Sequence, residues 1–433
     1  MNSSEANILV IGGGGREHAI ANKLRRDGVK KIYCAPGNAG TELIATNVNL
    51  DLNNFDSILE FLGEKDIHLT VVGPEDPLHH GLVNFFQDNQ QLIIGPTFQA
   101  TRLETSKVFA RHLMDMNKIP QPEYRICRDI GRAEEAKSDF GLPIVVKAYG
   151  LAVGKGALVC QTEFEWKEAL QIMFVDKKFG SANDIVLVEE CLVGEELSVF
   201  ALCDDLAYQI IGTAQDHKRL LDDDLGPNTG GMGAYSPTPL STPALLAEVK
   251  KLIIKPILSA MSHLGYPYQG FLYVGLMLTG DGPKVIEFNV RLGDPETQVI
   301  LPLIKSSLFD LLYQTAQGKL KEAKPIEFND LFAVTVVKVA GGYPDKYDKG
   351  NPIIGLAGLY QPDLDNVIQA GTKKDEYGRI VTNGGRVISL TGFGSDLKQA
   401  IANAYHLAYK VNFKDEHFRR DIGRRGLSYE KVI

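Results

Sequence analysis

Three polar residues recur at every second position of one otherwise apolar segment. KVIEFNVRLGDPETQ, residues 284 to 298, places Glu287, Asn289 and Arg291 on one face of a predicted strand, because side chains alternate along an extended chain. Mg²⁺ prefers hard oxygen ligands and is usually held by one or two protein groups together with substrate phosphates. Arg291, with Asp294 beyond it, could clamp a carboxylate or a phosphate. We therefore predict a metal site at Glu287 and Asn289; the alternative is an internal ion pair between Glu287 and Arg291.

A glycine-rich run follows another predicted strand. In VVKAYGLAVGKGALV, Lys147 stands near the strand end, and Gly154, Lys155 and Gly156 lie in the loop that follows. Glycine lets such a loop close over a triphosphate, and lysine supplies compact positive charge to its oxygens. The spacing does not fit the P-loop pattern. We expect a nucleotide-phosphate site of another class; the alternative for Lys147 is a solvated lysine beside a hairpin.

Carboxylates cluster where the strand in VLVEECLVGEEL ends. Glu189, Glu190 and Glu195 could bind ribose hydroxyls while the backbone meets an adenine edge, although a solvated turn is the alternative. His217, in AQDHKR, has no second histidine at ligand spacing. A hydrogen-bonded histidine is therefore favoured over a metal ligand.

Four glycines separate the first predicted strand from the first predicted helix. VIGGGGREH places Gly12 to Gly15 where free N–H groups and the helix dipole attract an anion. Glu17 replaces the third glycine of the dinucleotide fingerprint, and no acidic ribose ligand follows the second strand, so one phosphate is favoured over NAD. PGNAG (36–40) and GPEDPL (73–78) follow neighbouring strands at the same edge. The alternative is a tight turn that needs glycine for its backbone angles.

The elements that position these residues fall into successive stretches. Residues 7 to about 95 alternate strand and helix patterns, which predicts a parallel sheet, and Gly95–Pro96 marks a boundary. From about residue 100 the mixed order predicts an α+β region, in which 222–239 is expected to be a long loop. Helices are predicted over 105–117, 243–264, from 307 and over 395–411, and the last hundred residues add further strands.

Composition bounds the function classes. Hydrophobic residues make up 44% of the 433, and 46 Lys and Arg against 54 Asp and Glu give a net charge of −8, which argues against wholesale nucleic-acid binding. Five scattered cysteines without a CxxC pair predict reduced core thiols, and the absence of a long apolar run predicts a protein that is neither exported nor membrane-spanning. We expect a cytoplasmic protein.

Taken together, the motifs resemble those of the phosphoribosylamine–glycine ligase family, ATP-grasp enzymes of purine biosynthesis. VIGGGGREHA, APGNAGT, VGPEDPL, GPNTGGMGAYSP, GFLYVGLM, VIEFNVRLGDPETQ and VTNGGRV occur in the family's order along essentially the whole chain. The resemblance implies a multidomain α/β and α+β fold. Its parts would be a Rossmann-like parallel-sheet domain (1–104), an ATP-grasp domain in two lobes (105–324, small lobe about 122–192) and a small α+β C-terminal domain (325–433).

The same resemblance implies partners and site residues. ATP, glycine and 5-phosphoribosylamine would be the substrates of a monomer that binds neither nucleic acid nor membrane, with Mg²⁺ or Mn²⁺ on Glu287 and Asn289. ATP would contact Lys107, Lys147, Gly154, Lys155, Gly156, Glu189, Glu190 and Glu195. Phosphoribosylamine and glycine would contact Gly13, Gly14, Gly15, Arg16, Asn38, Glu75, Asp216, Lys218, Asn228, Arg291 and Asp294. Lys155, Asp216, Arg291 and Asp294 would be the catalytic set.

The chain departs from the family pattern at two positions in the predicted closing loop. Tyr149 stands where the family has Asp, and Val153 where it has Ala.

Two other functions fit parts of the pattern. Another ATP-grasp ligase or a biotin-dependent carboxylase would share Lys147, Lys155, Glu287 and Asn289 but would not need the phosphate edge, and a non-catalytic nucleotide-binding regulator is suggested only by Tyr149.

Overall fold

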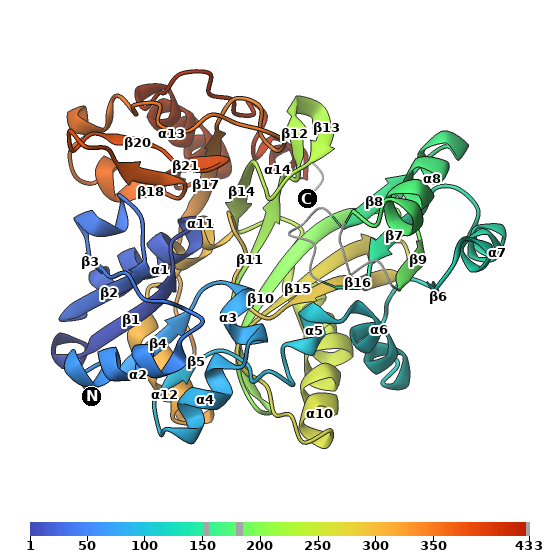
Figure 1. The fold of residues 1–433 in the computed structure, drawn as a ribbon, viewed down its shortest axis with the longest axis horizontal. Helices are drawn as coiled ribbons and strands as arrows, with labels where there is room; N and C mark the ends of the chain where they lie inside the picture. The colour runs from blue at the N-terminus through green and yellow to red at the C-terminus, as the bar shows by residue number, and fades with distance from the viewer. Residues whose placement is uncertain (151–155, 179–184, 430–433) are drawn as a thin grey trace.

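The first hundred residues form a parallel sheet with helices around it. The computed structural model describes residues 1–150, 156–178 and 185–429 (Figure 1). The strand order is β3-β2-β1-β4-β5, all parallel, which confirms the predicted α/β unit. The strands are β1 (Asn7–Gly12), β2 (Lys31–Pro36), β3 (Thr46–Asn47), β4 (Leu69–Val72) and β5 (Ile93–Ile94). The helices are α1 (Gly15–Arg26), α2 (Phe55–Glu64), α3 (Glu75–His79) and α4 (Leu82–Asp88).

A small antiparallel sheet projects to one side of the molecule (Figure 1). Its order is β6-β9-β7-β8, and Lys147 and Glu189 lie on its two central strands. The strands are β6 (Tyr124–Cys127), β7 (Ile144–Ala148), β8 (Ala157–Cys160) and β9 (Val186–Glu190). Helices α7 (Ile130–Phe140) and α8 (Glu163–Leu170) belong to the same unit. Trp166 is fully buried in its core.

One long sheet joins the middle of the chain to its C-terminal part. Its order is β16-β15-β10-β11-β14-β17-β21-β18. The strands are β10 (Glu195–Asp204), β11 (Ala207–Asp216), β14 (Gly233–Ser236), β15 (Gln269–Thr279), β16 (Gly282–Asn289), β17 (Phe332–Val339), β18 (Val367–Gln369) and β21 (Arg386–Gly394). The strand that carries Glu287 therefore lies at one edge, and the C-terminal strands continue the same sheet. The boundary predicted near residue 325 falls between β14 and β17, which are paired.

The remaining helices cover this sheet. α5 (Arg102–Thr105) and α6 (Lys107–Met116) precede the small sheet, and residues 243–263 form one helical stretch made of α9 (Pro243–Val249), a π-helical turn and α10 (Lys255–His263). α11 (Thr297–Ile300), α12 (Leu308–Ala316), α13 (Leu397–Lys410) and α14 (Arg424–Tyr429) follow. The predicted helices are therefore present, with ends within a few residues of those expected. Within the described ranges, no helix has both the length and the apolar character needed to cross a membrane.

The prediction of a long loop over residues 222–239 is wrong. This stretch contains β13 (Leu225–Asn228), which forms a hairpin with β12 (Arg219–Leu221), and also β14. β14 is buried along its whole length because it pairs with β11 on one side and β17 on the other. Its Asp-, Gly- and Pro-rich surroundings are typical of loops. The strand is selected by partners distant in sequence, which local composition does not reveal.

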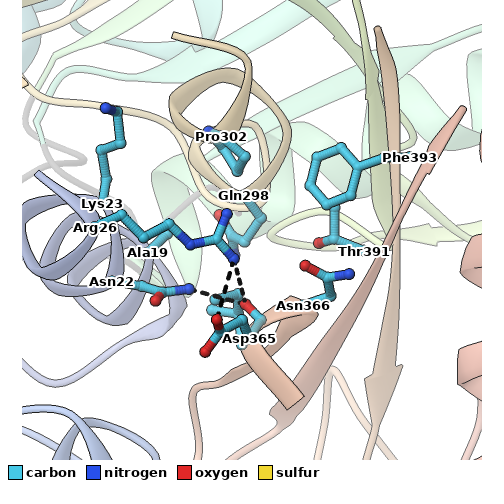
Figure 2. A pocket seen from close by; sticks show the side chains of 11 residues that line it. Ala19, Asn22, Lys23, Arg26, Gln298, Pro302, Asp365, Asn366, Thr391 and Phe393 are labelled. Atoms are coloured by element: carbon cyan, nitrogen blue, oxygen red, sulfur yellow. Dashed lines mark hydrogen bonds and ion pairs between the residues drawn. The ribbon is translucent and has the colours of Figure 1, made fainter. Parts of the chain in front are cut away.

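Helix α1 fastens the first unit to the C-terminal one. Figure 2 shows Asn22 and Arg26 of α1 directed at Asp365, and the Asn22 amide donates to the Asp365 carbonyl over 2.8 Å. A cavity of about 20 Å³, room for about one water molecule, remains between the two surfaces beside Gln298. His18, on the same helix, accepts a hydrogen bond from the Gln369 N–H over 2.9 Å. The two ends of the chain therefore form one packed body around α1.

Candidate active site

The predicted metal strand places its two oxygen donors together. On β16 the Asn289 side-chain amide lies 3.5 Å from a Glu287 carboxylate oxygen, and both residues are half-buried. Burial opposes ionisation of Glu287, but Lys218, Lys147 and Lys107 outweigh it and hold the pKa of the carboxyl below its usual value. Glu287 therefore stays anionic and surrounded by positive charge. Its carboxylate and the Asn289 carbonyl oxygen suit a small divalent cation.

Arg291 does not pair with Glu287, so the predicted alternative of an internal ion pair is wrong. Its Nε lies 3.1 Å from Glu75, at the start of α3, and its Nη2 lies 3.0 Å from Glu104 of α5. The other Glu104 oxygen accepts from the Val290 N–H over 2.7 Å. These bonds tie the first unit to the end of the metal strand. Glu104 was not predicted, since the sequence around it shows an ordinary short helix.

The two described lysines of the expected nucleotide site have defined partners. Lys147 Nζ lies 2.8 Å from Glu189 Oε2, and Lys107 Nζ donates to the Gly150 carbonyl over 2.8 Å. Burial lowers the pKa of Lys107, and the neighbouring Lys147 lowers it further. Gly156 continues the β7–β8 hairpin and accepts from the Ala148 N–H over 2.9 Å. Val153, Gly154 and Lys155 lie outside the described residues.

Tyr149 is built into the base of this hairpin. Its hydroxyl accepts a hydrogen bond from Ser106, the residue that caps α6, over 3.0 Å. Its carbonyl accepts from the Lys107 N–H over 3.3 Å. The tyrosine therefore contacts the start of the helix that carries Lys107.

The three candidate ribose carboxylates differ in their surroundings. Glu189 is only 2% exposed and is held by Arg111 and Lys147, so the solvated-turn alternative is wrong for it. Glu190 accepts from Lys284 and from the Glu123 N–H, each over 3.1 Å. Glu195 accepts from the Gln215 amide over 3.3 Å. Glu190 and Glu195 are half-buried and accessible to a ligand.

The glycine turn at the start of α1 keeps part of its anion-binding capacity. The Gly14 N–H donates to Glu17 over 2.6 Å, so the residue that breaks the dinucleotide fingerprint caps the helix. The N–H groups of Gly15 and Arg16 have no acceptor among the described residues. Gly13 must be glycine, because a Cβ there would lie 2.6 Å from the Gly37 carbonyl oxygen. Two N–H groups therefore remain free at the positive end of a helix dipole.

Arg16 and Asn38 make contacts within the protein at this edge. Arg16 donates to the Leu292 carbonyl over 3.0 Å and to Glu17 over 2.6 Å. The Asn38 amide donates to the carbonyls of Gly13 and Gln369, each over 2.9 Å, and its oxygen accepts from the N–H groups of Gly40 and Thr41. Asn38 therefore holds the glycine turn in place and has no remaining donor for a ligand.

A group of mixed charge lies near the metal strand, in which Asp216 and Glu296 are buried while Lys218 and Glu196 are partly exposed. Lys218 Nζ lies 2.6 Å from Glu196, and its pKa is raised well above the usual value by Glu196 and Asp216. Burial raises the pKa of both Asp216 and Glu296; Glu196 raises that of Asp216 further, and Asp216 raises that of Glu296. Asn228 ends β13, opposite Arg219. Glu296 was not predicted, although it lies in the quoted DPETQ motif.

His217 is fully buried between these residues. Burial, followed by the neighbouring Arg425 and Arg419, lowers its pKa to about 3. Its Nε2 accepts from the Gly423 N–H over 3.4 Å. The hydrogen-bonded histidine favoured from the sequence is confirmed.

Asp294 stands where all the parts of the chain meet. Its carboxylate accepts from the Gln298 amide over 2.7 Å and lies 3.1 Å from Nη2 of Arg386, which belongs to the C-terminal unit. A Cβ placed on Gly15 would lie 3.5 Å from Asp294 Oδ1, so this carboxylate faces the glycine turn. Burial opposes ionisation of Asp294, but Arg386 and the Gln298 amide lower its pKa. Arg386 was not predicted as a site residue, although it belongs to VTNGGRV, one of the family's motifs.

One large groove of the described structure lies away from these residues. A groove of about 760 Å³ lies between β11, α9 and the segment 323–332, and its lining includes none of the predicted site residues. No group of three or more His, Cys, Asp or Glu side chains with metal-binding geometry occurs within residues 1–150, 156–178 and 185–429. A divalent cation on Glu287 and Asn289 would therefore need further ligands, which substrate phosphates can supply.

Comparison with known protein families gives matches along almost the whole chain. The model of the phosphoribosylglycinamide synthetase N domain matches residues 6–104, that of the ATP-grasp (A) domain residues 105–297, and that of the C domain residues 333–425. A phosphoribosylamine–glycine ligase of Chlorobaculum tepidum is 43% identical over 97% of this chain and all of its own length. One of Caldanaerobacter subterraneus is 42% identical over 96% of this chain and 99% of its own.

Solved structures agree. The crystal structure of phosphoribosylamine–glycine ligase from Thermotoga maritima superposes with a TM-score of 0.84 at 33% identity, covering 96% of this chain and 100% of the other. A biotin carboxylase–ATP analogue complex from Campylobacter jejuni, at 16% identity and a TM-score of 0.69 over 99% of this chain and 96% of the other, shares the fold alone.

Proposed function

The chain belongs to the phosphoribosylglycinamide synthetase family, and we propose that it joins glycine to 5-phosphoribosylamine to give glycinamide ribonucleotide, ADP and phosphate. This is a ligase reaction of purine biosynthesis. The observation that carries the proposal is that Glu287 lies among Lys218, Lys147 and Lys107, while Arg291, further along the same segment, pairs with Glu75 of the first unit. A ligase that joins an activated acid to a phosphorylated amine needs both sites in contact.

The nucleotide would lie between the small sheet and β16. Lys107, Lys147 and the hairpin that carries Gly154, Lys155 and Gly156 would hold its phosphates, and Glu190 and Glu195 would contact the ribose and base together with the strand end at Glu189. Glu287 and Asn289 would hold Mg²⁺ or Mn²⁺, which lowers the charge of the transferring phosphoryl group. The ion pair of Lys147 with Glu189 and the half-buried carboxylates of Glu190 and Glu195 support the assignment.

The remaining residues would bind the two substrates to be joined. The free N–H groups of Gly15 and Arg16 support a phosphate site for phosphoribosylamine at the Gly13–Arg16 turn, with Glu75 near the sugar. Asn38 would act by holding that turn. Glycine would lie near Asp216, Arg291 and Asp294, with Arg291 on its carboxylate, and Lys218 and Asn228 would belong to the same set of residues that contact the two substrates.

The reaction needs no covalent nucleophile from the protein. The glycine carboxylate would attack the γ-phosphorus of ATP, releasing ADP and forming glycyl phosphate, while lysines neutralise the developing charge. The amine of phosphoribosylamine would then attack the activated carbonyl, and phosphate would leave. An acyl phosphate hydrolyses in water, so the hairpin after Lys147 must exclude solvent during both steps. Lys155, Asp216, Arg291 and Asp294 are the proposed catalytic set.

We place the domain boundaries at 1–104, 105–324 and 325–433, with a small lobe at about 122–192, and expect a cytoplasmic monomer. The small sheet, β6 to β9, supports the small lobe. Gel filtration with light scattering tests the monomer. A mass near twice that of the chain would contradict it.

A coupled assay separates the proposed activity from its two rivals. Phosphate release is followed with ATP, glycine and phosphoribosylamine, the last generated in place from ribose 5-phosphate and ammonia. We expect turnover only when all three are present. Turnover with ATP and bicarbonate, or with glycine replaced by another acid, would favour a different ATP-grasp enzyme. ATP binding by calorimetry without ADP release in any mixture would favour a regulator.

A further inference from the structure

A buried ion cluster joins three elements behind the proposed nucleotide site. It consists of Arg111 on α6, Glu189 on β9 and Lys147 on β7, which are 2%, 2% and 6% exposed. Arg111 holds Glu189 with two bonds, Nε to Oε1 over 2.7 Å and Nη2 to Oε2 over 2.9 Å. Lys147 Nζ lies 2.8 Å from the same Oε2. One carboxylate therefore has two cationic partners.

The same cluster holds the backbone of the metal strand. Arg111 Nη1 donates to the Val285 carbonyl over 3.0 Å, and its Nη2 donates to the Ile286 carbonyl over 2.8 Å. Lys147 donates to the Ile286 carbonyl over 3.3 Å. Ile286 directly precedes Glu287 in the chain. Arg111, which is distant in sequence, thus holds the backbone directly before Glu287, the carboxylate proposed to hold the metal.

The charges of the cluster do not balance. Within the cluster, two cations meet one carboxylate among side chains that are almost fully buried. The anionic Glu287 nearby offsets part of the excess positive charge but is shared with Lys107 and Lys218, so a further anion would be stabilised here. Glu189 is firmly ionised, because Arg111 and Lys147 outweigh its burial and lower its pKa to about 2. The two bonds from Arg111 occupy both Glu189 oxygens, so Lys147 shares one of them with the guanidinium. Lys147 consequently keeps charge and donor capacity that an incoming phosphate can use.

We propose that Arg111 is a positioning residue for the nucleotide. By sharing Glu189, it leaves Lys147 able to bind phosphate, and by holding the Val285 and Ile286 carbonyls it fixes Glu287. This inference rests on the proposed function, since it assumes that ATP and its metal bind at Lys147 and Glu287. Arg111 itself does not touch the substrates.

Removal of the guanidinium has a specific consequence under this proposal. In Arg111→Met, Glu189 would keep Lys147 as its only partner, and the pair would become neutral. Partners that orient a metal ligand typically contribute about 10- to 100-fold to affinity. We therefore expect the dissociation constant of a non-hydrolysable ATP analogue with Mg²⁺ to rise by about that factor. KM for phosphoribosylamine should change by less than about twofold, because its site lies in another unit.

The experiment compares five variants by calorimetry, thermal unfolding and steady-state kinetics. They are Arg111→Met, Arg111→Lys, Glu189→Gln, the double variant Arg111→Met/Glu189→Gln, and the control Lys338→Met. Lys338 is also a buried cation paired with a carboxylate, Glu416 at 2.7 Å, but it lies in the C-terminal unit. It reports what the loss of any buried cation does to stability. We expect it to lower the unfolding temperature without changing nucleotide affinity.

The outcomes are distinct. Arg111→Met and Arg111→Lys should both lose nucleotide affinity, and Arg111→Lys should lose less. In the double variant, the fold-loss of affinity should be smaller than the product of the fold-losses of Arg111→Met and Glu189→Gln, because the two residues act as one unit. Wild-type affinity in Arg111→Met, or losses that multiply in the double variant, would overturn the proposal. If Arg111→Met does not fold, Arg111→Lys and Glu189→Gln carry the same comparison. Failure of the wild-type protein to bind the analogue would instead refute the proposed function.

Discussion

Arg386 Nη2 lies 3.1 Å from Asp294 Oδ2, although the two residues belong to different units of the chain. The guanidinium also donates to the carbonyl oxygens of Gly230 and Asp294. Asp294 faces the glycine turn at the start of α1, where an uncompensated carboxylate would repel a phosphate. The arginine therefore neutralises a negative charge at the proposed substrate-phosphate site.

Arg386→Gln should accordingly weaken the binding of phosphoribosylamine more than that of ATP. Loss of one charge-assisted bond is typically about 1.5–3 kcal/mol, so KM for phosphoribosylamine should rise by roughly 10- to 100-fold. KM for ATP should stay within about threefold of the wild-type value. Steady-state kinetics with each substrate varied in turn measures both. Equal increases for the two substrates would indicate a general structural role.

Glu287→Ala should abolish metal-dependent turnover while leaving the fold intact. The carboxylate is ionised and surrounded by lysines, and without it the metal loses its charged protein ligand. We expect turnover to fall by at least about 100-fold. Activity assays over a range of Mg²⁺ concentrations, with circular dichroism for folding, test this. Glu60→Ala, which removes an exposed carboxylate from α2, is the matched control. Wild-type rates in Glu287→Ala would refute the metal assignment.

Arg16→Ala should mainly raise KM for phosphoribosylamine, by about tenfold, because only that substrate brings a phosphate to the glycine turn. The side chain also holds Glu17 and the Leu292 carbonyl, so a modest loss of thermal stability should accompany the change. Kinetics and thermal unfolding are measured together. Arg128→Ala, which alters an exposed arginine on the small lobe, should change neither. An unchanged KM in Arg16→Ala would place the phosphate elsewhere.

His18 should make the junction between α1 and the C-terminal unit sensitive to acid. Burial lowers its pKa from 6.5 to about 4, and the neutral ring accepts the Gln369 N–H. Because the pKa of His18 is lower in the folded protein than in the unfolded one, the neutral ring adds to the free energy of unfolding. This contribution is complete above about pH 6.5 and is lost as the pH falls towards 4. The loss should approach about 3 kcal/mol at full protonation.

Urea unfolding at pH 7.0, 5.5 and 4.5 tests this dependence. His18→Gln keeps an acceptor and a similar size but cannot be protonated. It should be less stable than the wild type at pH 7 and should show a shallower decline in the free energy of unfolding with acid. Parallel pH profiles of the two proteins would show that other groups control acid unfolding.

Local pattern was enough to predict several features of this protein. The alternation in KVIEFNV brought Glu287 and Asn289 together, and the glycines of VIGGGGREH predicted a strand, a turn and a helix. The parallel sheet and the long helices followed from periodicity, which depends on residues close in sequence. Recognition of the family added the order of the domains and the reaction.

What only the tertiary structure decided is which charges meet. Arg111 and Glu189 are 78 residues apart, Arg386 and Asp294 are 92 apart, and neither pair was predicted. Local composition predicts a loop at β14, and the strand forms because its two neighbours, β11 and β17, are supplied by other parts of the chain. Residue types and spacing indicate which chemistry a side chain can perform. Tertiary packing determines the partner of a buried charge, because a charge removed from water is costly unless a neighbouring group compensates it.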